Sequence, residues 1–94
     1  MHVTVRFAGS LRDLAGVRGT LIELSAQATT GDALDAIAHQ FPRIHRELFG
    51  VEPKGYYSIF VNDKLIAETD RQKTALNDGD DMLLVLPIAG GLSF

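Results

Sequence analysis

The residues of this chain that could carry chemistry lie close to its C-terminus, and they are not side chains. Residues 85–94 read VLPIAGGLSF, an apolar run followed by Gly90, Gly91 and three further residues, LSF. A glycine pair has no Cβ to obstruct passage through a narrow channel, and it reaches backbone conformations closed to other residues. We therefore predict that Gly90 and Gly91 form the reactive end of the molecule and that residues 92–94 cover it.

The side chains elsewhere are weaker candidates for catalysis. Cysteine is absent, which excludes disulfides, thiolate zinc sites and cysteine nucleophiles on this chain. The serines lack the context of a nucleophile elbow, the glycines fit no dinucleotide or P-loop fingerprint, and the histidines lack a metal-ligand spacing. Asp78, Asp80 and Asp81 are of a type that binds cations, but a solvated turn before a strand is the simpler interpretation. We expect neither a metal nor a bound cofactor.

Length and composition limit the class of protein. A chain of 94 residues, 46% hydrophobic and 22% charged, is expected to fold as one domain. Its formal net charge of -3 argues against a nucleic-acid surface, which needs clustered lysine and arginine. No segment approaches the roughly 18 apolar residues that span a bilayer, and the N-terminus has no leader pattern. We expect a cytoplasmic protein that binds neither nucleic acid nor membrane.

The positioning elements can be predicted from hydrophobic periodicity. Residues 2–8, HVTVRFA, alternate polar and apolar side chains, as in a strand with one buried face. Residues 56–62, YYSIFVN, are rich in aromatic and branched side chains and run into an Asn-Asp turn. The expected strands are 2–8, 20–25, 56–62, a short strand at 64–67, and 82–87.

One main helix is expected, at residues 31–41. Its apolar residues recur at i, i+3, i+4 and i+7, which is the spacing of a single helical face. The flanking expectations are a cap at Thr29 or Thr30, a stop at Pro42, an added turn within 43–49 and a short helical turn within 9–16. Because one helix covers one face of a sheet, we predict a two-layer α+β domain over residues 1–87 and a flexible tail over 88–94.

The uncovered face of the sheet is the expected contact surface. Both parities of strand 82–87 are apolar, so one set must point away from the helix. We predict that Leu83 and Val85 point outward with Phe60, and that these residues and Pro87 bind a partner. The alternative is a central strand that is buried on both faces.

Four stretches together resemble the MoaD/ThiS family of ubiquitin-like sulfur carriers, and its MoaD-like branch most closely. The most specific combination is DGD, an apolar strand, a proline and a Gly-Gly about a dozen residues after the turn. The resemblance implies the β-grasp fold, a mixed sheet of four to five strands with one main helix packed on one face. The stretches are VRFAGSLRDLAG, TTGDALDAIAHQFP, FVND and LNDGDDMLLVLPIAGG, which cover nearly the whole chain.

The resemblance also implies a mechanism, in which the carrier is a co-substrate and not an enzyme. A ubiquitin-activating-like enzyme adenylates the terminal glycine with ATP that the enzyme itself binds, and a sulfur donor then displaces AMP. The resulting thiocarboxylate passes its sulfur to a biosynthetic enzyme. In the family Gly-Gly is usually terminal, so we expect a JAMM-type metalloprotease to cleave between Gly91 and Leu92. Gly91 then carries the sulfur, and Gly90 helps the tail thread into the partner.

Three alternatives remain open from sequence. The glycine pair can be a plain linker in a chain that has lost the carrier role. The protein can be the small subunit of molybdopterin synthase, acting in molybdenum cofactor biosynthesis. It can also be a ubiquitin-like modifier that forms isopeptide bonds with lysines.

Overall fold

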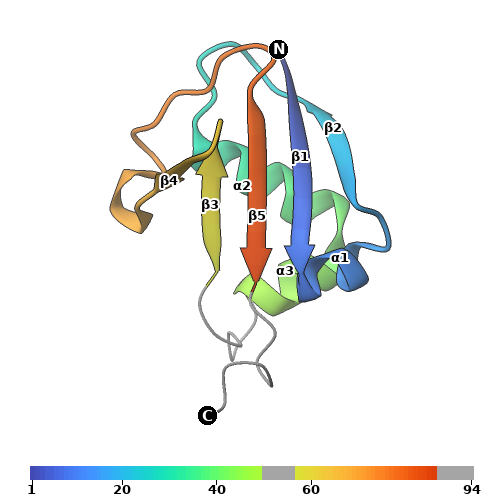
Figure 1. Cartoon of the computed structure of the whole chain (residues 1–94). Coiled ribbons are helices and arrows are strands. Elements are labelled where there is room, and N and C mark those ends of the chain that lie inside the picture. The colour runs from blue at the N-terminus through green and yellow to red at the C-terminus, as the bar shows by residue number, and fades with distance from the viewer. Residues whose placement is uncertain (50–56, 87–94) are drawn as a thin grey trace.

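Five strands and three α-helices account for most of residues 1–49 and 57–86, the part of the chain that the computed structural model describes. The elements in chain order are β1 (His2–Gly9), α1 (Ser10–Ala15), β2 (Gly19–Glu23), α2 (Thr30–Gln40), α3 (Pro42–Phe49), β3 (Ser58–Val61), β4 (Lys64–Ile66), the 3-10 helix η1 (Glu68–Asp70) and β5 (Asp81–Leu86). Figure 1 shows the sheet face-on with α2 and α3 behind it, and with α1 at the end where β1 and β5 finish. The expected two-layer α+β arrangement is therefore present.

The strands form one mixed sheet in the order β2-β1-β5-β3-β4. β1 and β5 run parallel, with Thr4 opposite Asp81, and the other three neighbouring pairs are antiparallel. β5 therefore occupies the centre of the sheet, although it comes last in the sequence (Figure 1).

The core lies between the sheet and the helices, and alternate strand residues supply it. Phe7 of β1 meets Phe41 edge-on, with ring centroids 5.3 Å apart and an interplanar angle of 79°. Alternate positions are buried along β1, β3 and β5, and in β1 this confirms the period-2 prediction for residues 2–8. The buried positions of these strands are Val3, Val5, Phe7, Ile59, Val61, Met82, Leu84 and Leu86.

A capping box starts α2. The Thr29 side chain accepts a hydrogen bond from the Asp32 backbone N–H at 3.2 Å, and the Asp32 carboxylate accepts one from the Thr29 N–H at 2.9 Å. Such a cap contributes about 1 kcal/mol, because it satisfies backbone donors that a first helical turn leaves unpaired. Of the two threonines considered from sequence, Thr29 is therefore the cap. Leu34 and Ile37 point into the core, as the helical spacing predicted.

Several element boundaries differ from those expected. Pro42 ends α2 but also begins α3, an eight-residue helix where only a further turn was expected. Proline suits the first helical position, because its missing N–H has no partner there. Ile44 is fully buried and anchors α3 to the core. The second strand ends at Glu23, the third begins at Ser58, and η1 was not predicted.

Candidate functional site

A row of side chains crosses the open face of the sheet, the face that α2 and α3 do not cover (Figure 1). Leu83 of β5 lies opposite Phe60 of β3 on one side and opposite Arg6 of β1 on the other. Phe60 in turn lies opposite Leu65 of β4. Phe60 and Leu83 are half-buried, whereas Leu65 exposes 58% of its surface. The outward orientation predicted for Phe60 and Leu83 is confirmed.

A second row lies beside the first, toward the end of β5. Val85 stands between Ala8 of β1 and Ser58 of β3, and all three are half-buried. β5 is a central strand, as the alternative interpretation supposed, but its outward side chains are not buried as that interpretation required. We call Phe60, Leu65, Leu83 and Val85 the open-face patch. Its contact with a partner stays a prediction.

The last residue of β5 is held in place by the turn between β1 and α1. Gly9 lies opposite Leu86, and its own φ is 66°. A Cβ added at Gly9 would overlap the Leu86 carbonyl oxygen. The Ser10 hydroxyl donates to the same oxygen at 3.5 Å. Leu86 itself is 4% exposed and belongs to the core. The point from which the tail continues is therefore fixed to the body of the domain.

Residues 87–94 lie outside the described part of the chain. They include the partner-binding candidate Pro87, the reactive candidates Gly90 and Gly91, and the cleavage position at Leu92. Their roles stay predictions. What the structure adds is the position of Leu86, next to Val85 of the open-face patch.

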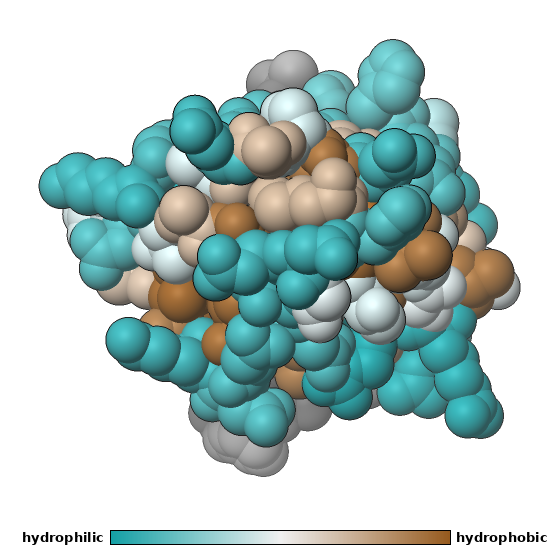
Figure 2. Space-filling model, turned by 90° about the horizontal axis from the view of Figure 1, so that it is seen from above, coloured by the Kyte–Doolittle hydropathy of each residue, from teal (hydrophilic) through white to brown (hydrophobic). Residues whose placement is uncertain are grey.

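The acidic turn before β5 uses its carboxylates within the fold. The Asp78 carboxylate accepts from the His2 backbone N–H at 2.7 Å. The two oxygens of Asp80 accept from the Asn62 amide at 2.9 Å and from the Asn77 backbone N–H at 2.8 Å. These bonds support the turn interpretation. Seen from this end, where the N-terminus also lies, the surface is predominantly hydrophilic (Figure 2).

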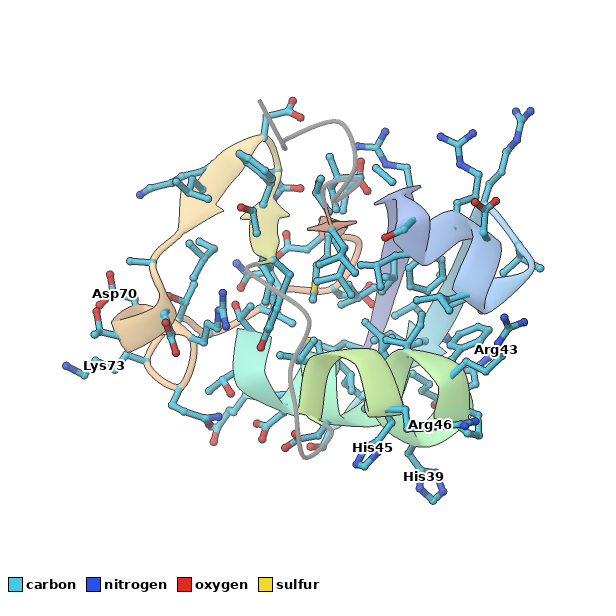
Figure 3. All side chains as sticks on the ribbon, turned by 90° about the horizontal axis from the view of Figure 1, so that it is seen from below. His39, Arg43, His45, Arg46, Asp70 and Lys73 are labelled. Carbon is cyan, nitrogen blue, oxygen red and sulfur yellow. The ribbon has the colours of Figure 1, made fainter. Side chains whose placement is uncertain are left out.

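The histidines do not converge on a site. His2, His39 and His45 are all exposed, and Figure 3 shows His39 and His45 on the helix layer, pointing away from the sheet. Within residues 1–49 and 57–86, no group of three or more histidines and carboxylates is placed to hold a metal ion. No helix in the same two ranges is long and apolar enough to cross a membrane.

The arginines beside the open-face patch were not found from sequence. The Arg6 guanidinium makes two contacts with the Asp81 carboxylate, at 3.1 and 2.9 Å. Arg12 and Arg18 line the same recess as Arg6 and Leu83. The signal in the sequence was the six-residue spacing of Arg6, Arg12 and Arg18. The connection between β1 and the antiparallel β2 returns the chain toward Arg6.

The chain is similar to a known protein family and to proteins of known structure. A model of the ThiS family matches residues 5–91, so the match includes both glycines and stops before Leu92. Small archaeal modifier protein 1 of Haloferax volcanii is 33% identical over 81 residues, which cover 86% of this chain and 91% of that protein.

Solved structures agree with the family match. A crystal structure of SAMP1 from Haloferax volcanii has a TM-score of 0.81 at 27% identity, covering 97% of this chain and 100% of that one. The putative molybdopterin converting factor, subunit 1, from Pyrococcus furiosus has a TM-score of 0.76 at 27% identity, covering 94% and 99%. The five-stranded mixed sheet and its main helix are the β-grasp fold of these structures. The chain therefore belongs to the ThiS family of small ubiquitin-like carriers and modifiers, which are not enzymes.

Proposed function

We propose that the protein is a sulfur carrier that works through the C-terminal carboxylate of Gly91 after Leu92, Ser93 and Phe94 are removed. The observation that carries this proposal is that the family match ends at Gly91, three residues before the last residue of the sequence. Because Leu92 follows Gly91 in the sequence, the Gly91 carboxyl group is part of a peptide bond until that bond is cleaved. A JAMM-type metalloprotease that cleaves after Gly91 would expose the required carboxylate.

The chemistry takes place on a partner, a ubiquitin-activating-like adenylating enzyme. The Gly91 carboxylate attacks the α-phosphate of ATP held by that enzyme and releases pyrophosphate. A sulfur donor at the oxidation level of sulfide then attacks the acyl adenylate, AMP leaves, and a thiocarboxylate remains. The thiocarboxylate sulfur is ionised at neutral pH, and the anion is the reactive form. In the biosynthetic enzyme, the sulfur attacks an electrophilic carbon of the acceptor, and water then cleaves the bond between this sulfur and the Gly91 acyl carbon, which leaves the sulfur on the acceptor and regenerates the Gly91 carboxylate.

The domain and the tail have separate tasks in this scheme. The open-face patch holds the partner, since contiguous apolar side chains without a covering layer mark contact sites. The tail then reaches the nucleotide. Gly91 is five residues beyond Leu86, and five extended residues span at most about 18 Å. The fixed position of Leu86 therefore limits how far from the patch the partner's nucleotide can lie.

Two further functions have support from particular relatives. The Haloferax volcanii relative is called a small archaeal modifier protein, which favours attachment of Gly91 to lysines. The Pyrococcus furiosus structure is described as a putative molybdopterin converting factor subunit, which favours a small subunit of molybdopterin synthase. Lysine adducts in a cell lysate would identify the first, and a stable complex with a large synthase subunit would identify the second.

The decisive experiment follows the fate of Gly91. The chain ending at Gly91 is incubated with the adenylating enzyme of the same organism, ATP and sulfide, and its intact mass is measured. We expect one carboxylate oxygen to be replaced by sulfur, while the chain that retains residues 92–94 stays unchanged. Mass spectrometry of the protein from its native cells tests the trimming. If every molecule there retains Leu92, Ser93 and Phe94, the carrier proposal is wrong.

A further inference from the structure

Three arginines surround one recess at the edge of the open-face patch. The recess has a volume of about 350 Å³ and is lined by Arg6, Phe7, Ala8, Arg12, Arg18 and Leu83. Arg6 comes from β1, Arg12 from α1, and Arg18 from the segment just before β2. All three side chains are exposed. We call Arg6, Arg12 and Arg18 the arginine recess.

The charges of the arginine recess are only partly balanced. Asp81 neutralises Arg6 through the two contacts described above. Within the described part of the chain, neither Arg12 nor Arg18 pairs with a carboxylate, although Asp13 lines a neighbouring recess with them. Among the described residues, three guanidinium groups and one paired carboxylate leave Arg12 and Arg18 without an ion-pair partner, in a chain whose net charge is -3. Like charges held around one recess repel one another, and an anion placed between them relieves that repulsion.

Leu83 shows what kind of anion fits. Its side chain lines the arginine recess and also forms the centre of the open-face patch. A molecule that covers both must present apolar and anionic groups side by side over a wide area. A protein surface does this, whereas a free inorganic anion does not. Guanidinium groups often bind carboxylates at two points, and Arg6 already makes one hydrogen bond and one ion-pair contact with the Asp81 carboxylate.

We infer that the arginine recess receives aspartate or glutamate side chains of the protein that docks on the open-face patch. This inference rests on the proposed function, in which that protein is the adenylating enzyme. The acidic residues of the enzyme lie beside the apolar area that covers Leu83 and Phe60. Arg12 and Arg18 supply the unpaired charges, and Arg6 stays paired with Asp81.

The position of the recess also orients the approach of the partner. α1 lies at the end of the sheet where β5 finishes, and the acidic turn with Asp78 and Asp80 lies at the opposite end (Figure 1). An acidic partner is attracted by the first end and repelled by the second. Such complementarity chiefly raises the association rate and sets orientation, and it weakens as salt increases. The partner therefore arrives with its acidic edge near Leu86, the last residue of β5.

The test measures the dissociation constant of the chain ending at Gly91, the reactive form in the proposed function, and the purified adenylating enzyme without ATP, by calorimetry at low and high salt. Arg12→Glu with Arg18→Glu is expected to weaken binding about tenfold or more at low salt and to flatten the salt dependence. Arg12→Lys with Arg18→Lys keeps the charges and should keep most of the affinity. The matched control is Arg43→Glu with Arg46→Glu. This control changes the net charge by the same amount as the Arg12 and Arg18 reversal, but its residues lie on α3 in the helix layer (Figure 3). The dissociation constant of this control should stay close to that of the wild type.

Each other outcome overturns the inference in a recognisable way. If the wild type and the variant with Arg12→Glu and Arg18→Glu bind equally well, the arginine recess does not receive acidic side chains of the enzyme. The proposed function stays intact in that case, since a complex still forms. A wild-type chain that forms no complex would reject the adenylating enzyme as partner, and the inference with it. Inorganic phosphate that binds the wild type but not the reversal would assign the recess to a phosphate group. Circular dichroism and thermal midpoints of all variants show that each is folded.

Discussion

Leu83 and Phe60 face each other across the antiparallel pair of β5 and β3, on the side of the sheet that α2 and α3 do not cover. Their strand neighbours Met82, Leu84, Ile59 and Val61 form part of the core. The same two strands therefore supply both the hydrophobic interior and the exposed apolar surface. A change at Leu83 or Phe60 should affect recognition without emptying the core.

A charge placed in the open-face patch should weaken docking. We expect Leu83→Asp or Phe60→Asp to raise the dissociation constant for the adenylating enzyme by about tenfold or more, as for central interface residues. Leu21→Asp is the control, because Leu21 exposes 61% of its surface on the same face but belongs to β2, outside the patch. Loss of the folded state in the Leu83 variant would show that its side chain contributes to the core instead.

Gly91→Ala should leave folding unchanged, because the residue lies beyond β5, yet it should slow adenylation of the chain ending at residue 91. A misplaced reacting carboxylate commonly costs about a hundredfold in rate. ATP-dependent pyrophosphate release measures the effect. The control is the chain ending at residue 91 without the substitution. Equal turnover of the Gly91 variant and the wild type would count against the tail as the reactive end.

Gly9→Ala should be far more damaging than Gly16→Ala. Both glycines have positive φ, which costs a side chain of order 1–3 kcal/mol. At Gly16 an added Cβ meets nothing within 4 Å, whereas at Gly9 it overlaps the Leu86 carbonyl oxygen. We expect the free energy of unfolding, from urea denaturation, to fall by about 1 kcal/mol for Gly16→Ala and by clearly more for Gly9→Ala. Similar losses of unfolding free energy in the two variants would mean that the backbone of β1 and β5 shifts at little cost to make room for the added Cβ.

The stability of the domain should fall at high pH through Tyr57. Burial raises the pKa of Tyr57 above its ordinary value of 10.0, and Arg71, whose guanidinium lies 4.5 Å from the ring centroid, opposes the shift. A folded-state pKa above the unfolded value means that the stabilisation is complete below pH 10 and is lost as pH rises through the folded pKa. Urea midpoints on either side of pH 10 should therefore drop less for Tyr57→Phe than for the wild type. A Tyr56→Phe variant that behaves like Tyr57→Phe would contradict this assignment.

Much of the fold could be predicted because local periodicity and burial agree. Alternation in residues 2–8 identified β1, and the apolar run at 82–87 identified β5 together with the outward direction of Leu83. The length of α3 was underestimated, because Pro42 signals a helix stop and a helix start equally well. η1 lies in a polar segment without periodicity, so no pattern marked it.

The site was only half predictable. The open-face patch follows from strand parity, but the arginine recess does not, because its residues come from three elements and form no motif. Arg12 and Arg18 come together only once α1 and β2 fold back along β1. Chain order alone does not show on which side of the sheet that return places their side chains. The reactive tail was predicted from its glycines and its likeness to a family, and it stays a prediction.

The central place of β5 has a consequence for how the protein is made. Without that strand, the hairpin of β1 and β2 and the pair of β3 and β4 have no edge in common, so a nascent polypeptide stopped short of Asp81 has two halves and no continuous sheet. Joining residues 4 and 81 is a long-range step of the kind that slows folding. During synthesis, the strand that completes the sheet ends at Leu86, only a few residues before Gly90 and Gly91. A copy stopped short of Asp81 therefore lacks both a continuous sheet and the two glycines.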